Sequence, residues 1–295
     1  MTNASADNQE QIRHWNEVAG PLWVERQDLL DRMIGAFGVR AIDAARFAPG
    51  ERVLDVGCGT GQTTVEIARR VGPGGRVVGV DVSRPMLDGA RRRAAASAPT
   101  PAPGAAPIDF VEGDAQVMPL EKAAFDVVFS RFGVMFFADP AAAFVNLRAA
   151  LRPGGRLVFL CWQGVARNAW VAGPVQALAA VLPMPAPPPP GAPGPFAFAE
   201  PDRVRGILGA AGYREIALEE IEDALVVGDG SVESTLEFLL HIGPCATLLK
   251  GAPRETVDTA RSTLRAFFQR IARDGEVHLR GTTWLVTARP VASAG

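Results

Sequence analysis

The chain alternates between short apolar runs and longer segments in which apolar residues recur every three or four positions. Short apolar runs are typical of buried strands, and the longer period is typical of helices that pack on one face. From about residue 50 to residue 165 the two patterns take turns along the chain. Such an alternation predicts a parallel sheet with helices on both faces. We therefore expect an α/β fold with a doubly wound, mostly parallel sheet.

Seven segments have the pattern of strands. They are residues 52–56, 76–82, 108–114, 125–130, 156–162, 215–227 and 282–290. The helices expected between and after them share three- to four-residue apolar spacing, and several end at glycine. They cover residues 62–71, 84–96, 140–151, 168–182, 200–213, 231–242 and 255–275. Together these segments predict a seven-stranded, Rossmann-like sheet.

The periodic pattern also divides the chain into four parts. They are an N-terminal helical cap (1–45), a ligand-binding core (46–165), a helix with a proline-rich connector (166–198) and a last part that completes the core (199–295). The last part carries an inserted helical segment, 229–275, which the bare fold does not need. We expect this insertion to act as a lid.

Composition excludes several classes of protein. The chain has 295 residues and a formal net charge of −2, so no overall field draws it to nucleic acid. Its three cysteines stand apart, without a CxxC pair or a cysteine–histidine cluster, so neither a disulfide framework nor a metal site is expected. The polar N-terminus and the shortness of the apolar runs predict a cytoplasmic protein without membrane insertion.

The stretch VLDVGCGTG, residues 53–61, has a strand, an acid and three alternate glycines, Gly57, Gly59 and Gly61. A dinucleotide-binding turn would have its third glycine at Gln62, and a phosphate-binding P-loop would have a lysine there. Asp55 would also repel a pyrophosphate. A carboxylate at this place suits a ligand that carries an ammonium group.

Two further acids follow the next strands. Asp81 ends the second strand and can accept hydrogen bonds from two ribose hydroxyls, and Asp114 ends the third and can accept from an adenine amino group. The carboxyl ends of parallel strands lie along one edge of the sheet, where ligands bind. Ammonium, ribose and adenine together describe S-adenosylmethionine.

The chain resembles the class I S-adenosylmethionine-dependent methyltransferases, and within them the ubiquinone/menaquinone-biosynthesis-like branch. Five stretches carry the resemblance in order: VLDVGCGTG, VVGVDVS, FVEGDAQVMPL, FDVVFSRFGVMFF and LRPGGRLVF. It covers residues 12–165 strongly and the last strands more weakly. The resemblance implies S-adenosyl-L-methionine as cofactor and transfer of its methyl group by direct in-line displacement.

By position, the resemblance also implies a set of cofactor-binding residues. These are Asp55, Gly57, Cys58, Gly59, Gly61, Asp81, Val82, Met86, Asp114, Ala115 and Ser130. Asp55 and the glycine turn would hold the methionine part, Asp81 the ribose, and Asp114 with Ala115 the adenine. Ser130 would lie in the loop beneath the cofactor.

The methyl acceptor is expected to be a small hydrophobic or aromatic molecule, because aromatic residues gather in the segments that should wall its pocket. The residues proposed for this pocket are Trp15, Trp23, Arg131, Phe132, Met135, Phe136, Trp162, Trp170 and Phe238. No general base stands out, and His14 and His241 are the candidates. Residues 231–250 are expected to cover the carboxyl ends of the fourth and fifth strands, with Phe238 or His241 facing the acceptor.

Other functions are disfavoured but stay open. The chain lacks the N/D/S-P-P-aromatic motif of base-methylating enzymes after the fourth strand, and Cys245 lies too late in the chain for a cytosine C5 nucleophile. An NAD-type oxidoreductase is disfavoured by Gln62 and Asp55. A non-catalytic binding module with this fold would be expected to lose glycines or the ribose acid. The acceptor atom stays open, as does the choice between monomer and homodimer.

Overall fold

The structure is a computed structural model that describes residues 8–97, 104–186 and 188–291. Its centre is one seven-stranded sheet with the order β3-β2-β1-β4-β5-β7-β6. The strands are β1 (Arg52–Val56), β2 (Arg76–Asp81), β3 (Ile108–Glu112), β4 (Phe125–Arg131), β5 (Leu151–Trp162), β6 (Tyr213–Ser231) and β7 (Glu276–Pro290). β7 pairs antiparallel with both of its neighbours, and the first five strands pair in parallel. The predicted doubly wound, mostly parallel sheet is confirmed.

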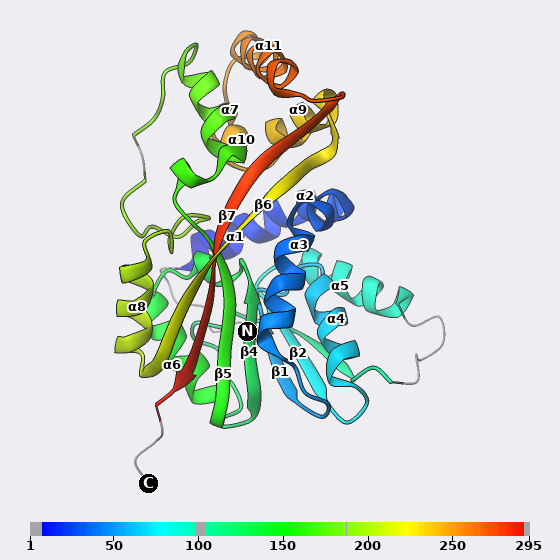
Figure 1. Ribbon diagram of the computed structural model, residues 1–295, viewed down its shortest axis with the longest axis vertical. Helices are drawn as coiled ribbons and strands as arrows, with labels where there is room; N and C mark the ends of the chain where they lie inside the picture. The colour runs from blue at the N-terminus through cyan, green and yellow to red at the C-terminus, as the bar shows by residue number, and fades with distance from the viewer. Residues whose placement is uncertain (1–7, 98–103, 187, 292–295) are drawn as a thin grey trace.

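Helices cover both faces of this sheet and extend beyond its carboxyl edge (Figure 1). They are α1 (Gln9–Glu17), α2 (Ala19–Glu25), α3 (Gln27–Ala45), α4 (Gln62–Val71), α5 (Arg84–Ala96), α6 (Pro140–Ala150), α7 (Ala169–Ala179), α8 (Pro201–Ala210), α9 (Val232–His241), α10 (Pro244–Leu249) and α11 (Arg254–Ile271). Short 3-10 turns lie at Val134–Phe136 and Val165–Arg167.

Local sequence explains where the core helices begin. Ser83 caps α5 by accepting a hydrogen bond from the Met86 amide, with a proline in the first turn. Asp139 caps α6 in the same way by accepting from the Ala142 amide, also before a proline. These caps fix the points at which the chain leaves strands β2 and β4, and so they position the loops of the site.

The strand order reverses between β1 and β4, because β1 pairs with β2 on one side and with β4 on the other. Apolar side chains form most of the core around this point: Leu54 and Phe129 are fully buried, and Phe37 of α3 is also fully buried in the same core. At such a switch point the loops after the two strands separate and leave room for a ligand. The site lies above this point.

The last two strands are longer than the sequence pattern predicted. β6 continues to Ser231 because a bulge between Val226 and Ser231 contains two glycines with positive φ, Gly228 and Gly230. The glycines had the pattern of a turn, but the strand resumes its pairing beyond them. β6 and β7 therefore extend past the sheet as a two-stranded ribbon that carries the insertion (Figure 1).

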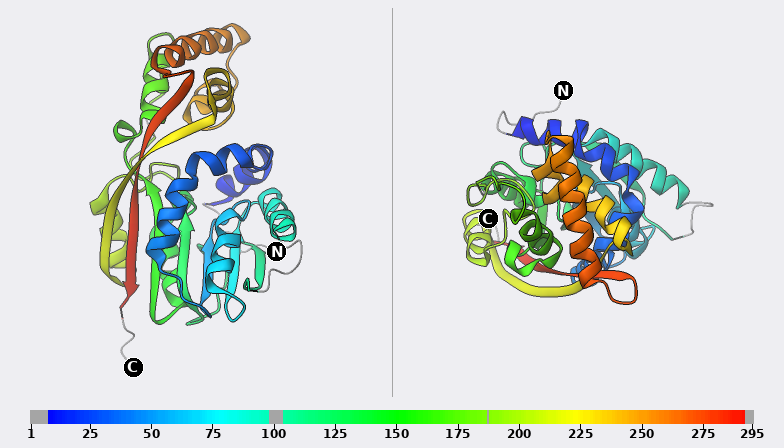
Figure 2. Two further views of the ribbon diagram at one scale, coloured as in Figure 1. Left: turned by 45° about the vertical axis from the view of Figure 1, so that its right-hand side comes forward. Right: turned by 90° about the horizontal axis from the view of Figure 1, so that it is seen from above.

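Three helices form the insertion, where the sequence predicted two. α10 is the additional one: Gly243, at φ 88°, turns the chain, and Pro244 begins the helix. α7 packs against α10 and α11, so the insertion and the helix after β5 form one layer above the core. α1 and α2 lie between this layer and the core (Figure 2).

Candidate active site

The glycine-rich loop after β1 is tied to the end of β2. The amides of Gly57 and Cys58 donate to the Val80 carbonyl oxygen, and the amide of Gly59 donates to Asp81 Oδ2 at 2.9 Å. Gly57 and Gly59 both have positive φ, at 65° and 56°, which favours glycine. A Cβ added at Gly57 would stand 2.6 Å from the Gly133 backbone. The loop therefore needs glycine at these positions for its backbone conformation and for its close approach to Gly133. Without side chains there, the loop backbone itself lines the cavity.

Asp81 stands at the end of β2 and lines the same cavity. Oδ1 accepts from the Ser83 amide at 2.8 Å, and Oδ2 accepts from Gly59. Burial raises the pKa of this carboxyl, while the amides of Ser83 and Gly59 oppose the rise. Each carboxylate oxygen can accept more than one hydrogen bond, so a fixed pair of acceptors remains for ligand hydroxyls.

Asp114 follows β3 and is buried beside Asn8, a residue without any motif in the sequence. Asn8 Nδ2 donates to Asp114 Oδ2 at 3.0 Å, and the amide of Gln116 donates to Oδ1 at 2.9 Å. A carboxylate only accepts, so the Asn8 amide is oriented with its oxygen away from Asp114. That oxygen is buried and has no hydrogen-bond partner among the described residues, and Asn8 lines the cavity. The pair offers acceptors to a donor such as an amino group.

Three of the residues proposed for the cofactor lie behind the loop and do not line the cavity: Asp55, Gly61 and Ser130. Asp55 is fully buried and accepts from the hydroxyls of Thr63 and Thr64 at 3.0 and 2.7 Å. Burial raises its pKa to about 6. These contacts hold the first turn of α4, and direct contact of Asp55 with a cofactor stays a prediction.

Ser130 joins the ends of β1 and β4. Its hydroxyl donates to the Val56 carbonyl at 2.7 Å and accepts from the Gly133 amide at 3.2 Å. Gly61 packs against α5, where an added Cβ would stand 2.9 Å from the Ala90 Cβ. Both residues support the loop from below, and their part in cofactor binding stays a prediction.

A cavity of about 1340 Å³ extends from the glycine loop to the insertion. The other eight residues proposed for the cofactor line it: Gly57, Cys58, Gly59, Asp81, Val82, Met86, Asp114 and Ala115. All the residues proposed for the acceptor line it too: Trp15, Trp23, Arg131, Phe132, Met135, Phe136, Trp162, Trp170 and Phe238. The fold thus brings the two proposed sets together around one space.

Aromatic rings form the middle of this cavity. Phe132 stacks on Trp162 with ring centroids 4.5 Å apart and an interplanar angle of 10°. Phe132 has a positive φ of 64°, which is rare for a bulky residue and is typical of functional loops. Trp15 of α1 meets Phe136 of the 3-10 turn after β4 edge-on at 5.0 Å, and it meets Trp23 of α2 at 5.6 Å.

Arg131 is the charged residue of this aromatic region. Its guanidinium donates to Gln62 Oε1 at 2.6 Å and lies 3.7 Å from Asp31, which also pairs with Arg93 at 2.5 Å. Burial lowers the pKa of Arg131, and Asp31 opposes that effect. Asp31 and Gln62 were not predicted as site residues, because nothing in the local pattern of α3 or α4 indicates a contact with β4.

Both candidate bases line the cavity and are exposed. His241 Nδ1 lies 2.7 Å from the Glu237 carbonyl oxygen in the same helix. A carbonyl only accepts, so Nδ1 carries the proton of the neutral ring, and Nε2 keeps its lone pair. Burial, followed by the charge of Lys250, lowers the pKa of His14. A base role stays a prediction for each.

The proline-rich connector also borders the cavity, although its sequence suggested only a spacer. Met184 and residues 188–197 line the space, and the Gly194 amide donates to the Met135 carbonyl oxygen at 3.0 Å. This bond attaches the connector to the loop after β4. Its position could not be read from the sequence, because a proline-rich segment has no periodicity that shows what it packs against.

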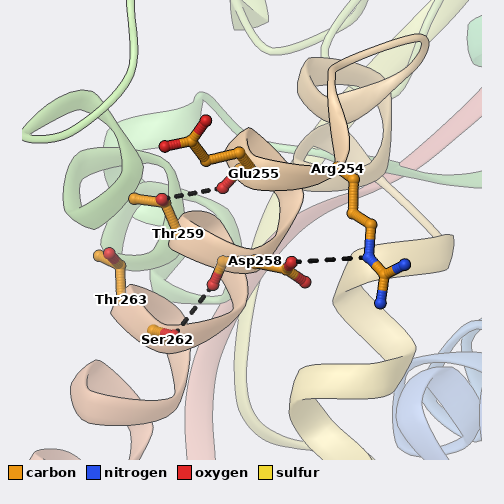
Figure 3. Close-up of a pocket in the computed structure, with 6 residues that line it drawn as sticks. All are labelled: Arg254, Glu255, Asp258, Thr259, Ser262 and Thr263. Carbon is orange, nitrogen blue, oxygen red and sulfur yellow. Dashed lines mark hydrogen bonds and ion pairs between the residues drawn. The ribbon is translucent and has the colours of Figure 1, made fainter.

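A separate hollow lies on the outer face of α11 (Figure 3). All six residues that line it belong to that helix: Arg254, Glu255, Asp258, Thr259, Ser262 and Thr263. The hydroxyls of Thr259 and Ser262 donate to carbonyls one turn earlier, at 2.9 Å each. Its polar groups are thus used within the helix, and no residue of the glycine loop reaches it.

Residues 8–97, 104–186 and 188–291 contain no group of three histidine, cysteine or acidic side chains placed to hold a metal ion. Among the same residues, no helix is long and apolar enough to cross a membrane.

Fold and site together define a protein that binds a nucleoside-bearing ligand at the switch point of a doubly wound sheet. Residues 53–155 match the family model of the methyltransferase domain. The demethylmenaquinone methyltransferase of Thermus thermophilus is 34% identical over 202 residues, which are 64% of this chain and 88% of that protein. Nocamycin O-methyltransferase of Saccharothrix syringae is 31% identical over 207 residues, 66% of this chain and 70% of that protein.

Among solved structures, the [4+2]-cyclase SpnF has a TM-score of 0.53 at 18% identity and covers 99% of both chains. At this identity the likeness concerns the fold. The sequence relationships show more: the chain belongs to the class I S-adenosylmethionine-dependent methyltransferases, in the menaquinone- and ubiquinone-like branch. It is a methyltransferase with S-adenosyl-L-methionine as its cofactor. The flat glycine loop and the unpartnered Asn8 oxygen fit this group.

Proposed function

We propose that the enzyme methylates a bulky, largely apolar aromatic molecule of the quinol type. The observation that carries this proposal is the single aromatic-walled cavity of about 1340 Å³. Sites for one drug-sized ligand usually measure ~300–1000 Å³, so this space has room for an acceptor beside the cofactor. Two relatives support this proposal, because they are named as methyltransferases of small molecules: demethylmenaquinone methyltransferase and nocamycin O-methyltransferase.

In this proposal the lower part of the cavity holds the cofactor. The backbone of Gly57 to Gly59 would lie against its methionine part, Asp81 would accept from the ribose hydroxyls, and Asp114 with Asn8 would accept from the adenine amino group. When bound, S-adenosylmethionine supplies an electrophilic methyl group on a sulfonium sulfur.

The residues above the loop would orient the acceptor and exclude water. Phe132 and Trp162 present a stacked pair of rings on one side, and Trp15 with Phe136 closes the other. Holding two reactants at attack distance in a dry site supplies much of the rate of such a displacement. A hydroxyl acceptor must also lose its proton, and in this proposal His241 would accept it, because its Nε2 keeps a lone pair while Nδ1 bonds to the Glu237 carbonyl oxygen.

Mass spectrometry of acceptors tests this function. Reduced 1,4-naphthoquinone and a prenylated demethylmenaquinol, each incubated with S-adenosylmethionine, should gain one methyl group as an equal amount of S-adenosylhomocysteine appears. Glycine and guanidinoacetate serve as hydrophilic controls and should gain none. If the hydrophilic controls are methylated faster than the quinols, the proposal of an apolar aromatic acceptor is wrong.

A further inference from the structure

Charged residues are distributed unevenly along the cavity. The acidic residues among its lining are Asp31, Asp81 and Asp114, and none of them belongs to the insertion. Each is already engaged: Asp31 with Arg93 and Arg131, Asp81 with two backbone amides, and Asp114 with Asn8 and a backbone amide. The side of the cavity that faces the insertion has no acid among its described lining residues.

The ionisable side chains that line the cavity on that side are basic. His241, Lys250 and Arg261 line the cavity from the insertion, and His14 lines it from α1. Arg261 forms an ion pair with Glu237, and His241 bonds to a backbone carbonyl. Lys250 differs, since it has no ion-pair partner among the described residues. It is also one of only two lysines in a chain with 30 basic residues.

Lys250 lies at the mouth of the cavity. It follows the last turn of α10 and is exposed, and His14 is exposed on α1. Burial is the main cause that lowers the pKa of His14, and the charge of Lys250 is the next, so the two side chains are within electrostatic reach. α10 lies above α1 in Figures 1 and 2. An apolar interior with a cationic mouth is the arrangement that fits an amphipathic anion.

We propose that Lys250 binds an acidic group of the methyl acceptor, a carboxylate or an ionised phenol or enol, at the mouth of the cavity, with the apolar ring system of the acceptor inside. This inference rests on the proposed function, because it concerns the acceptor compartment of that site. The ammonium of Lys250 supplies the attraction, and the aromatic wall accepts the rings. Because the acidic group stays at the mouth, the atom to be methylated is at the inner end of the acceptor, toward the glycine loop.

Two dyes that differ in one charge test this assignment. 8-Anilinonaphthalene-1-sulfonate carries an anionic group on an aromatic frame, and N-phenyl-1-naphthylamine has the same frame without it. Each dye is titrated by fluorescence into the full-length protein saturated with S-adenosylhomocysteine. Four proteins are compared: wild type, Lys250→Met, Lys250→Arg and Lys122→Met, the last being the control at the other lysine.

The expected result is a selective loss. Lys250→Met should weaken one-to-one binding of the sulfonate dye about tenfold, as loss of a charge-assisted contact would, and should leave the neutral dye unchanged. Lys250→Arg should retain the affinity, and Lys122→Met should match the wild type. Equal weakening of both dyes, or no change in either, would overturn the assignment. Calorimetric binding of S-adenosylhomocysteine in the same samples separately tests the methyltransferase site, so the two failures can be told apart.

Discussion

Asp55 is fully buried and Asp81 is half-buried, and the two acids stand at the ends of neighbouring strands in different environments. Asp81 faces the cavity and is held by backbone amides. Asp55 does not line it and is held by two threonine hydroxyls, with one carboxylate oxygen unpartnered among the described residues. A buried carboxylate with few donors is costly to ionise. The sequence motif predicts both acids as cofactor ligands and does not show that only Asp81 lines the cavity.

The first prediction concerns the pH dependence that Asp55 brings to stability. Its pKa is raised from the ordinary value of 3.8 to about 6, so the folded state holds this proton more tightly than the unfolded chain. The stability it contributes is complete below pH ~4 and is lost as pH rises through about 6, a loss of ~3 kcal/mol. Asp55→Asn, which keeps an oxygen for both hydroxyls, should not show this loss.

Urea unfolding of the cofactor-free protein at pH 4, 5, 6 and 7 measures this effect. The difference in unfolding free energy between Asp55→Asn and wild type removes the contributions of other carboxylates. Between pH 4 and pH 7 we expect the unfolding free energy of the wild type to fall by up to ~3 kcal/mol relative to that of Asp55→Asn. A difference that stays constant over this range would show that Asp55 titrates normally.

The second prediction concerns Asn8. Its unpartnered oxygen beside Asp114 should accept from the adenine amino group, so Asn8→Ala should weaken S-adenosylhomocysteine binding ~3- to 10-fold, the loss of about one hydrogen bond. S-inosylhomocysteine has no amino group there, and its affinity should not fall in the variant. Calorimetry with both compounds tests this. Equal weakening of the two would mean that Asn8 only supports α1.

At the scale of elements, hydrogen bonds join α1, and through it the N-terminal helices, to the turn after β2. Ser83 Oγ donates to the Trp15 carbonyl oxygen at 2.7 Å, and Asn16 bridges the Val82 carbonyl and the Arg84 amide at 2.8 and 3.0 Å. These bonds hold the N-terminal helices over the end of the strand that carries Asp81. A substitution that displaces these helices should therefore weaken cofactor binding.

The third prediction uses Gly20 of α2. A Cβ at this position would stand 2.1 Å from the Trp15 carbonyl oxygen and 2.4 Å from Ser83 Oγ, so Gly20→Ala must displace one of the helices. We expect binding of S-adenosylhomocysteine to weaken at least about tenfold, with a stability loss of ~1–3 kcal/mol from overpacking. Calorimetry and chemical unfolding measure the two effects.

Gly35 in α3 is the matched control. An added Cβ there meets nothing within 4 Å, so Gly35→Ala should stabilise the protein by ~0.5–1 kcal/mol through helix propensity alone. Its cofactor affinity should equal that of the wild type. If Gly20→Ala behaves like Gly35→Ala, the N-terminal helices do not control the site in the way described.

The sequence predicted the elements that obey a simple period and missed those that do not. All seven strands were placed, the inner ones because buried strands give compact apolar runs and β6 because its apolar and polar residues alternate. The end of β6 and the helix α10 were missed, because glycines at 228, 230 and 243 have the pattern of turns, and β7 begins at Glu276 rather than at residue 282. Asn8, Asp31 and the connector were missed for another reason. They join the site through contacts with distant segments, which leave no local pattern.

At the scale of the molecule, three segments far apart in the sequence close one cavity over the switch point of the sheet: α1 and α2, the connector, and the insertion on the β6–β7 ribbon. The core supplies fixed acceptors, a glycine loop and the stacked pair Phe132–Trp162, and the added segments supply further apolar walls and basic groups. A site that is polar on one side and apolar on the other can hold two dissimilar ligands side by side. This division is what a transfer between cofactor and acceptor requires.

The most direct test of the account is calorimetric titration of S-adenosylhomocysteine into wild type, Asp81→Ala and Asp109→Ala. Asp109 is a half-exposed carboxylate of β3 that pairs with Arg76 on the surface, so it controls for loss of charge. The wild type and Asp109→Ala should bind one equivalent with equal affinity. Asp81→Ala should lose ~2–4 kcal/mol of binding free energy, as two charge-assisted hydrogen bonds would. A folded Asp81→Ala protein that binds S-adenosylhomocysteine as tightly as the wild type would contradict the account.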